Sequence, residues 1–182
     1  LSMLRLLKVY LVLLAFVSGF AYLHGRAEAR ASLVDLFVDQ AHCIAINIYH
    51  ESLWEPVRGK YAVAYVVMNR VRDTKFPDDA CNVVYEGPTQ KSWKDPNVTF
   101  PRRHSCQFSW YCDGKSDEAT NLELYEECFK IALQVMTVYG TSHENDPTDG
   151  ALWYHADYAD PDWNDIYKEH VKIGRHIFYG RP

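Results

Sequence analysis

The chain has 182 residues, of which 48% are hydrophobic and 14% aromatic, and its formal net charge is −5. This length and composition predict one globular domain with a sizeable core and exclude a disordered chain. Residues 1–31 carry +3, so the total leaves −8 on residues 32–182. A domain this acidic is not suited to follow phosphates, and nucleic acid is not expected as a partner.

The first thirty residues differ from the rest of the chain. Arg5 and Lys8 precede an apolar run of 15 residues, 9–23, and two A-x-A patterns follow within residues 27–31. A run of this length suits the core of a signal peptide better than a spanning helix, which needs about twenty residues. We predict that residues 1–31 are a signal peptide or a membrane tether, with a buried helix as a third alternative. Residues 32–182 then form one exported domain.

Export affects how the five cysteines are interpreted. In an oxidising compartment paired cysteines are expected. Cys106 and Cys112 bracket one short loop and are the favoured pair. Because the number is odd, at least one thiol must stay free, buried or intermolecular, and no spacing indicates a zinc ribbon.

The first predicted helix of the domain covers residues 33–50, with an apolar stripe at helical spacing. The stripe consists of Leu33, Phe37, Ala41, Ile44, Ala45 and Ile48. Pro56 suits the first turn of a second helix, and the long apolar run at 57–71 predicts that this helix is buried.

The second half of the domain begins with a loop-rich segment, 86–118, that contains an aromatic cluster, "QFSWYCDGKSD". A helix is predicted over 120–139, with Thr120 and Glu123 as a capping box and Gly140 as its end. The stretches "DPTDGALWYHADY" and "HVKIGRHIFYG" read as two paired strands. The predicted fold class is therefore α+β, mainly α, with a small antiparallel sheet.

Two groups of residues invite comparison with known catalytic motifs. His50-Glu51 begins like the zinc motif H-E-x-x-H, but Trp54 occupies the place of the second histidine. Cys43 could be a thiol nucleophile with His155 or His176 as its base, although its apolar surroundings favour a structural cysteine. The remaining histidines show no metal-ligand spacing, so no metal and no cofactor are expected.

Glu51 ends the apolar helix beside Tyr49 and Trp54. A general acid for glycoside cleavage must stay protonated near neutral pH, and partial burial raises a carboxyl pKa in that direction. From position alone, a solvated helix end is the simpler explanation. Many glycosidases need a second carboxylate, and the sequence leaves the choice open among Glu55, Asp113, Asp117 and Asp157.

Five ordered blocks between residues 44 and 179 resemble those of the spore cortex-lytic (SleB-type) cell-wall hydrolase family. They are "IYHESLWEPVRGKYAVAYVVMNRV", "FPDDACNVVYE", "CQFSWYCDG", "GALWYHADYADPDW" and "IGRHIFY". The resemblance implies a lysozyme-like catalytic domain over 32–182 that acts on peptidoglycan glycan strands. His50, Ser52 and Trp54 depart from the family pattern, which often has small residues there.

The family's catalytic glutamate corresponds to Glu51. The resemblance implies a lytic transglycosylase that cleaves between N-acetylmuramic acid and N-acetylglucosamine and leaves 1,6-anhydromuramyl ends. Substrate contacts are expected from Gln107, Phe108, Ser109, Trp110, Tyr154 and His155. Tyr49 and Glu55 are expected to support the site, whereas Asn69-Arg70 and residues 176–179 are assigned to the scaffold.

The predicted protein is thus a monomeric, exported or periplasmic wall-lysing or wall-remodelling enzyme, with a phage endolysin among the possibilities. Its partner is the peptidoglycan strand, and it meets a membrane only through its N-terminal segment. The sequence is also compatible with two alternatives: a wall amidase or peptidase using Cys43 or a metal, and a glycan-binding module without catalysis.

Overall fold

The computed structural model describes residues 3–139 and 145–182, with side chains from residue 26 onward except that of residue 27. The described chain forms two compact units, Leu1–Val38 and Asp39–Pro182. The described residues of the first unit are all part of helix α1 (Met3–Ser52), which continues into the second unit. The apolar run at 9–23 is helical, but its side chains lie outside the described ones. Its assignment as a signal peptide or tether therefore stays a prediction.

Helix α1 carries the predicted apolar stripe, but only its C-terminal part is buried. Ile44 and Ile48 are fully buried, whereas Leu33 is 67% and Phe37 39% exposed. The prediction that Leu33 and Phe37 are core residues is wrong, because both are exposed, and the buried part of the stripe begins at Ala41. By length and composition, Glu28–Ser52 could also cross a membrane. Its second half, however, is a core helix of the domain.

Helix α2 (Val57–Arg72) lies at the centre of the second unit. Val63, Ala64 and Val67 pack in a cluster with α1, α3 (Ala80–Val84) and α4 (Leu122–Tyr139). Ala62 and Val66 pack instead against the sheet. Burial on two faces explains why residues 57–71 read as an apolar run without a polar side. Pro56 precedes the helix as its N-cap and accepts from the backbone of Gly59.

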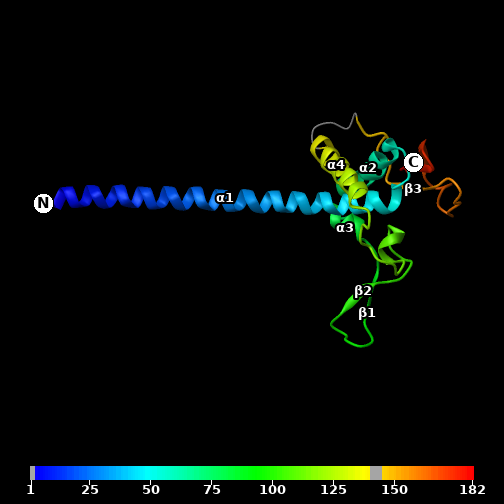
Figure 1. Ribbon diagram of the computed structural model, residues 1–182, viewed down its shortest axis with the longest axis horizontal. Helices are drawn as coiled ribbons and strands as arrows, with labels where there is room; N and C mark the ends of the chain where they lie inside the picture. The colour runs from blue at the N-terminus through cyan, green and yellow to red at the C-terminus, as the bar shows by residue number, and fades with distance from the viewer. Residues whose placement is uncertain (1–2, 140–144) are drawn as a thin grey trace. The chain divides into compact units, whose positions relative to one another are not determined.

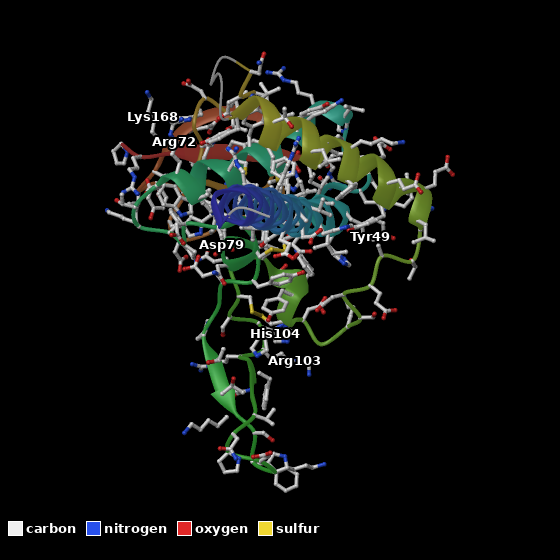
Figure 2. All side chains as sticks on the ribbon, turned by 90° about the vertical axis from the view of Figure 1, so that its left-hand side faces the viewer. Tyr49, Arg72, Asp79, Arg103, His104 and Lys168 are labelled. Atoms are coloured by element: carbon white, nitrogen blue, oxygen red, sulfur yellow. A yellow bond between two sulfur atoms is a disulfide. The ribbon has the colours of Figure 1, made fainter. Side chains whose placement is uncertain are left out.

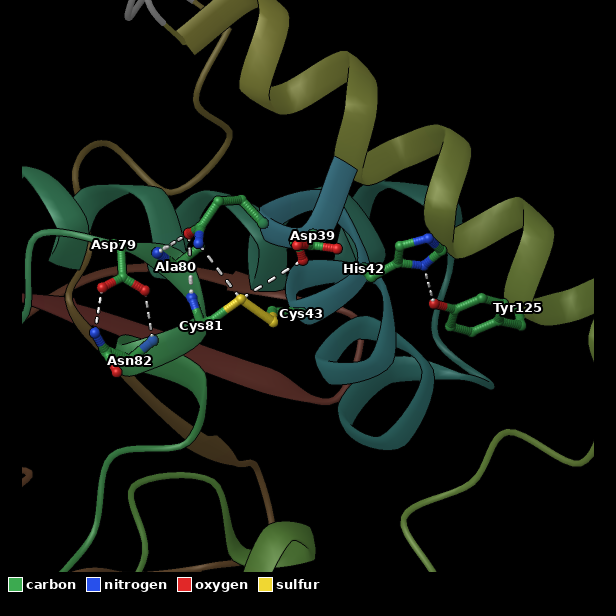
Figure 3. Close-up of a disulfide and its surroundings, with 9 residues drawn as sticks. Asp39, His42, Cys43, Asp79, Ala80, Cys81, Asn82 and Tyr125 are labelled. Carbon is green, nitrogen blue, oxygen red and sulfur yellow. Dashed lines mark hydrogen bonds between the residues drawn. A yellow bond between two sulfur atoms is a disulfide. The ribbon is translucent and has the colours of Figure 1, made fainter. Parts of the chain in front are cut away.

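A disulfide between Cys43 and Cys81 fixes α1 to α3 (Figure 3). Asp79 caps α3 by accepting from the backbone N–H of Asn82 at 2.8 Å. Gln40 Oε1 accepts from the backbone of Ala80 at 2.6 Å, next to the bridge. Covalent and polar contacts therefore hold this five-residue helix, which is too short to be stable alone.

The loop-rich segment contains a small hairpin that the sequence did not predict. Strands β1 (Thr89–Lys91) and β2 (Thr99–Pro101) pair in antiparallel register, and the hairpin projects from the helices (Figure 1). A 3₁₀ turn, η1 (Ser109–Cys112), follows. The predicted Cys106–Cys112 disulfide is confirmed and closes the loop that leads into η1.

Helix α4 begins one residue later than the predicted capping box requires. Asn121 Oδ1 accepts from the backbone N–H of Leu124, so Asn121 is the cap, and Thr120 contacts Tyr49 instead. The predicted box at Thr120 and Glu123 is therefore wrong in register. Asn121 competes well for this position because its short side chain reaches the same backbone donors. Gly140, the predicted end, lies outside the described residues.

The C-terminal segment forms three antiparallel strands in the order β3-β5-β4. They are β3 (Trp153–Ala156), β4 (Lys168–Ile173) and β5 (His176–Gly180). The stretch predicted as one strand, "HVKIGRHIFYG", is a hairpin, because Gly174 adopts φ +59° and turns the chain. A two-residue turn with glycine at positive φ is the expected hairpin connection. The small antiparallel sheet and the mainly helical domain agree with the predicted fold class.

Candidate active site

Glu51 lies in the last turn of α1, where the helix leaves the core. Ile48 beneath it is fully buried, and the hydroxyl of the buried Ser52 donates to the Ile48 carbonyl at 2.9 Å. The helix end is therefore fixed by packing, and Glu51 is held half-buried at the surface. A rigid element of this kind positions a functional side chain more accurately than a loop does.

Two hollows meet at Glu51. The first has a volume of about 600 Å³ and lies between η1, the loop after it and strand β3. The second, about 460 Å³, lies between the end of α1 and the β4–β5 turn. Both are lined by His50, Glu51, Ala156, Tyr158 and His176. Together they make one cleft with Glu51 near its middle, a shape that suits an extended ligand.

The carboxyl group of Glu51 is desolvated. Its burial raises its pKa, while the hydroxyl of Tyr154, which donates to Glu51 Oε2 at 3.0 Å, and the nearby Arg70 partly lower it. Burial outweighs both, so the protonated form is favoured relative to a carboxyl in water. Such a group can give a proton to a bound oxygen atom and then act as a base.

Tyr154 and Arg70 form the polar wall around Glu51. Burial and the neighbouring carboxylate raise the pKa of Tyr154 well above its ordinary value, so its hydroxyl stays a donor. Arg70 is buried, donates through Nε to the Leu152 carbonyl at 2.7 Å, and stacks over Phe108 at 5.2 Å. The guanidinium thus has a fixed position from which it attenuates, but does not cancel, the effect of burial on Glu51.

The other acids proposed from the sequence differ from Glu51. Asp113 lines the cleft, but hydrogen bonds and an ion pair with Lys115 lower its pKa. Asp157 pairs with Lys172 at 2.8 Å, which lowers its pKa as well. Burial raises the pKa of Asp117, but this residue is not among the described residues that line either hollow. Of Glu51, Asp113, Asp117 and Asp157, Glu51 is the one that both lines the cleft and has a raised pKa.

The aromatic loop supplies the wall of the cleft opposite β3. Of the expected contact residues, the structure places Gln107, Phe108, Ser109 and Trp110 along the first hollow. Phe108 and Trp110 are buried, and the indole N–H of Trp110 donates to Asn47 at 2.9 Å. Gln107 and Ser109 are exposed. The aromatic residues therefore fix the wall, and the two polar residues are the ones open to a ligand.

Strand β3 presents its two expected residues differently, because successive side chains of a strand point to opposite faces. Tyr154 turns toward Glu51. His155 hydrogen-bonds to the hydroxyl of Tyr179 at 3.0 Å and to the Ala156 carbonyl. Both line the first hollow, but only Tyr154 contacts the acid.

The two residues expected to support the site have separate partners. Tyr49 accepts through its hydroxyl from the backbone of Asn121 at 3.1 Å, which joins α1 to the start of α4. Glu55 accepts from the backbone N–H of Arg175 at 2.9 Å in the β4–β5 turn. This hydrogen bond joins the segment after α1 to the β4–β5 turn, and both segments line the second hollow. The roles of these residues in any reaction stay predictions.

Two of the three side chains that depart from the family pattern, His50 and Trp54, lie at the rim, whereas the third, Ser52, is buried. His50 stacks on Trp110 with ring centroids 4.5 Å apart and hydrogen-bonds to the Asp117 carbonyl. Trp54 is 88% exposed and lines the second hollow. His50 thus packs against the aromatic wall and supports it, while the exposed Trp54 adds surface to the rim of the second hollow.

Sequence reasoning assigned Arg70 and His176 to the scaffold. Both are buried as expected, and both also line the first hollow. Burial lowers the pKa of His176, which favours the neutral ring beside Tyr154. A signal for Arg70 was available, because a charged residue inside the apolar run "VVMNRV" is rarely buried without a specific partner.

The alternative based on a Cys43 nucleophile is wrong, because Cys43 forms the disulfide with Cys81. The free cysteine within the described ranges is Cys128, which is buried, and burial raises its thiol pKa to about 11. A thiolate is the reactive form, so Cys128 is suited to packing and not to catalysis. Among residues 26–139 and 145–182, no three His, Cys, Asp or Glu side chains are grouped as metal ligands.

Comparison with known proteins agrees with this geometry. Residues 54–179 match the Cell Wall Hydrolase family. The spore cortex-lytic enzyme of Bacillus cereus is 31% identical over 136 residues, and that of Oceanobacillus iheyensis 28%. Each alignment covers 74% of this chain but 42% and 39% of the relative. The chain therefore spans about two fifths of the length of these curated relatives.

Two solved structures are similar to the chain. They are the catalytic domain of the Bacillus cereus SleB protein and that of the germination-specific lytic transglycosylase SleB from Bacillus anthracis. Both have a TM-score of 0.54, with 28% and 29% identity, and each comparison covers 78% of this chain and 89% and 93% of the other. They confirm the predicted lysozyme-like, mainly helical α+β fold. The matched family range includes every cleft residue from η1 and the sheet, and the chain belongs to the cell wall hydrolase family.

Proposed function

We propose that the domain cleaves peptidoglycan glycan strands as a lytic transglycosylase, with Glu51 as both acid and base. The observation that carries the proposal is one desolvated carboxyl group, with a raised pKa, in the middle of an open cleft. Glu51 lies three residues before the matched family range, so its role rests on this geometry and on the sequence block around it.

The reaction needs no second carboxylate. Protonated Glu51 donates its proton to the oxygen between N-acetylmuramic acid and N-acetylglucosamine as the C1–O bond breaks, and N-acetylglucosamine leaves with a 4-hydroxyl. The Glu51 carboxylate then removes the proton from the muramyl 6-hydroxyl, whose oxygen attacks C1 and closes the 1,6-anhydro ring. Glu51 ends protonated. Asp113 and Asp157, each held in an ion pair, are poorly suited to activate water, which favours this route over hydrolysis.

The products of digestion test the proposal directly. We expect mass spectrometry of digested peptidoglycan to show 1,6-anhydromuramyl ends and no gain in reducing ends. New reducing muramyl ends would indicate a hydrolase instead. Binding to the wall without any new chain ends would indicate a glycan-binding module and would overturn the proposal.

Replacing Tyr154 with phenylalanine should shift the pH dependence of cleavage upward. The Tyr154 hydroxyl lowers the Glu51 pKa, so its loss raises that pKa further. Cleavage requires protonated Glu51 and falls as the pH rises through its pKa. The alkaline limb of the kcat profile should therefore move to higher pH. An unchanged limb with only a lower rate would contradict this role.

Several broader features belong to the same proposal. The domain acts outside the cytoplasm as a monomer, and residues 9–23 serve as a signal peptide or a tether. Its role is wall lysis or remodelling, and phage lysis is one setting for it. Size-exclusion chromatography and fractionation of cells that express the chain test the monomer and the location separately.

A further inference from the structure

Hairpin β1–β2 extends away from the helices of its unit (Figures 1 and 2). Five of its six strand residues are exposed and none is buried. Neither core cluster of the described residues includes a residue from 89–101. A two-stranded hairpin is only marginally stable by itself. This one adds little to the stability of the domain, and its surface is open to a partner.

The chemistry of the hairpin differs from that of the rest of the domain. Residues 88–103 carry four basic side chains, Lys91, Lys94, Arg102 and Arg103, against one acid, Asp95. Their net charge is +3, in a domain that carries −8 over residues 32–182, so the remainder of the domain carries −11. Such a contrast attracts an anionic partner to the hairpin and away from the rest of the surface.

The tip of the hairpin adds an aromatic surface. Trp93 is 87% exposed, and the Lys94 ammonium lies 5.3 Å from its ring centroid. Val98 and Phe100 are exposed on the same hairpin. Within the described ranges, Lys91 and Lys94 make no ion pair with a carboxylate. An exposed indole beside unpaired ammonium groups can stack on a sugar ring and attract a carboxylate.

The base of the hairpin is fixed to the wall of the cleft. The Arg103 guanidinium donates to the Asp113 carbonyl at 3.1 Å, and the backbone of Gln107 donates to the Glu86 carbonyl at 2.9 Å. Asp113 and Gln107 both line the first hollow, and the Cys106–Cys112 bridge closes the loop between them. The hairpin therefore starts from the same segment that forms this wall of the cleft.

We propose that hairpin β1–β2 is a second, non-catalytic binding element that holds the carboxylates of peptidoglycan peptide stems, with Trp93 stacking on a sugar of the same polymer. The inference rests on the proposed function, because it takes the polymer in the cleft to be peptidoglycan. Every second sugar of the strand is a muramyl residue that carries a peptide stem, so the polymer presents carboxylates repeatedly along its length. The connection between the hairpin base and the cleft favours this partner over an anionic membrane.

Cosedimentation with insoluble peptidoglycan, freed of other anionic polymers, tests the element. In a Glu51→Gln background, which prevents digestion, the variant Lys91→Gln/Lys94→Gln should bind about tenfold more weakly at low salt, the equivalent of two exposed ion pairs. The control Lys130→Gln/Lys168→Gln removes the same charge from exposed positions on α4 and β4 and should bind as the parent does. Both variants should unfold at the same temperature as the parent.

Three further arms separate the possible sources of binding. Amidating the peptide carboxylates of the peptidoglycan should remove the difference between parent and hairpin variant, as should raising the salt concentration to about 0.5 M. With Glu51 intact, kcat/KM on a short oligosaccharide without peptides should be the same in both. Equal binding by the hairpin variant, persistence of the difference after amidation, or a hairpin effect on anionic vesicles alone would overturn the inference. Failure of the proposed function would appear separately, as an absence of new chain ends.

Discussion

The substitution Glu51→Gln is expected to abolish peptidoglycan cleavage while leaving the fold intact. Glutamine keeps the size of the side chain and can accept from the Tyr154 hydroxyl, but it cannot donate a proton to the glycosidic oxygen or take one from the muramyl 6-hydroxyl. General acid–base catalysis contributes about 10²- to 10⁴-fold to a rate. Because one group performs both transfers here, we expect a loss near the upper limit, about 10⁴-fold or roughly 5.4 kcal/mol in the barrier.

The same substitution should not destabilise the domain. Burial disfavours the charged form of Glu51, so a neutral amide at this position is less costly to desolvate. Thermal unfolding should therefore occur at the parent's temperature or slightly above it. The control is Glu126→Gln, an exposed carboxylate on α4, which should keep full activity. Substantial cleavage by Glu51→Gln, measured as release of soluble glycan fragments, would rule out the assignment.

Two residues that the sequence singled out, Glu51 and Tyr154, are brought together in the structure, whereas several ends of elements were predicted wrongly. Glu51 and Tyr154 lie 103 positions apart and meet across the cleft, and both were named because each stands in a block of recognisable pattern. The electrostatic partner Arg70 was assigned to the scaffold, because periodicity shows that a segment is buried but not which of its side chains reaches a cavity. The raised pKa of Glu51 depends on that three-dimensional setting, because burial is its largest cause.

The errors in the fold have local physical causes. Leu33 and Phe37 continue the helical stripe of α1, and the spacing of apolar residues within one helix cannot show where its burial ends. The β4–β5 hairpin was read as one strand because "IGRH" carries a single glycine, and its positive φ decides the turn. Hairpin β1–β2 was missed because its strands have three residues each and bury no side chain, so they leave no alternation to detect.

The Cys43–Cys81 disulfide should contribute more to stability, and the Cys106–Cys112 disulfide more to substrate binding. The Cys43–Cys81 bridge closes a loop with a sequence separation of 38, and Cys106–Cys112 one with a separation of 6. By the entropy of loop closure, their removal should cost about 4 and about 2 kcal/mol of unfolding free energy, respectively. Chemical denaturation of Cys43→Ala/Cys81→Ala and Cys106→Ala/Cys112→Ala measures the two costs.

Their positions predict the reverse order for activity. Cys43 and Cys81 are not among the described residues that line the cleft, so Cys43→Ala/Cys81→Ala should keep its kcat and KM at temperatures where it is folded. Cys106 and Cys112 hold the loop that places Gln107 and Ser109 along the first hollow. Removing this bridge should raise KM with little change in kcat, because Glu51 and Tyr154 belong to other elements. A Cys43→Ala/Cys81→Ala variant that is folded but inactive would contradict both the structural role of that bridge and the single-acid mechanism.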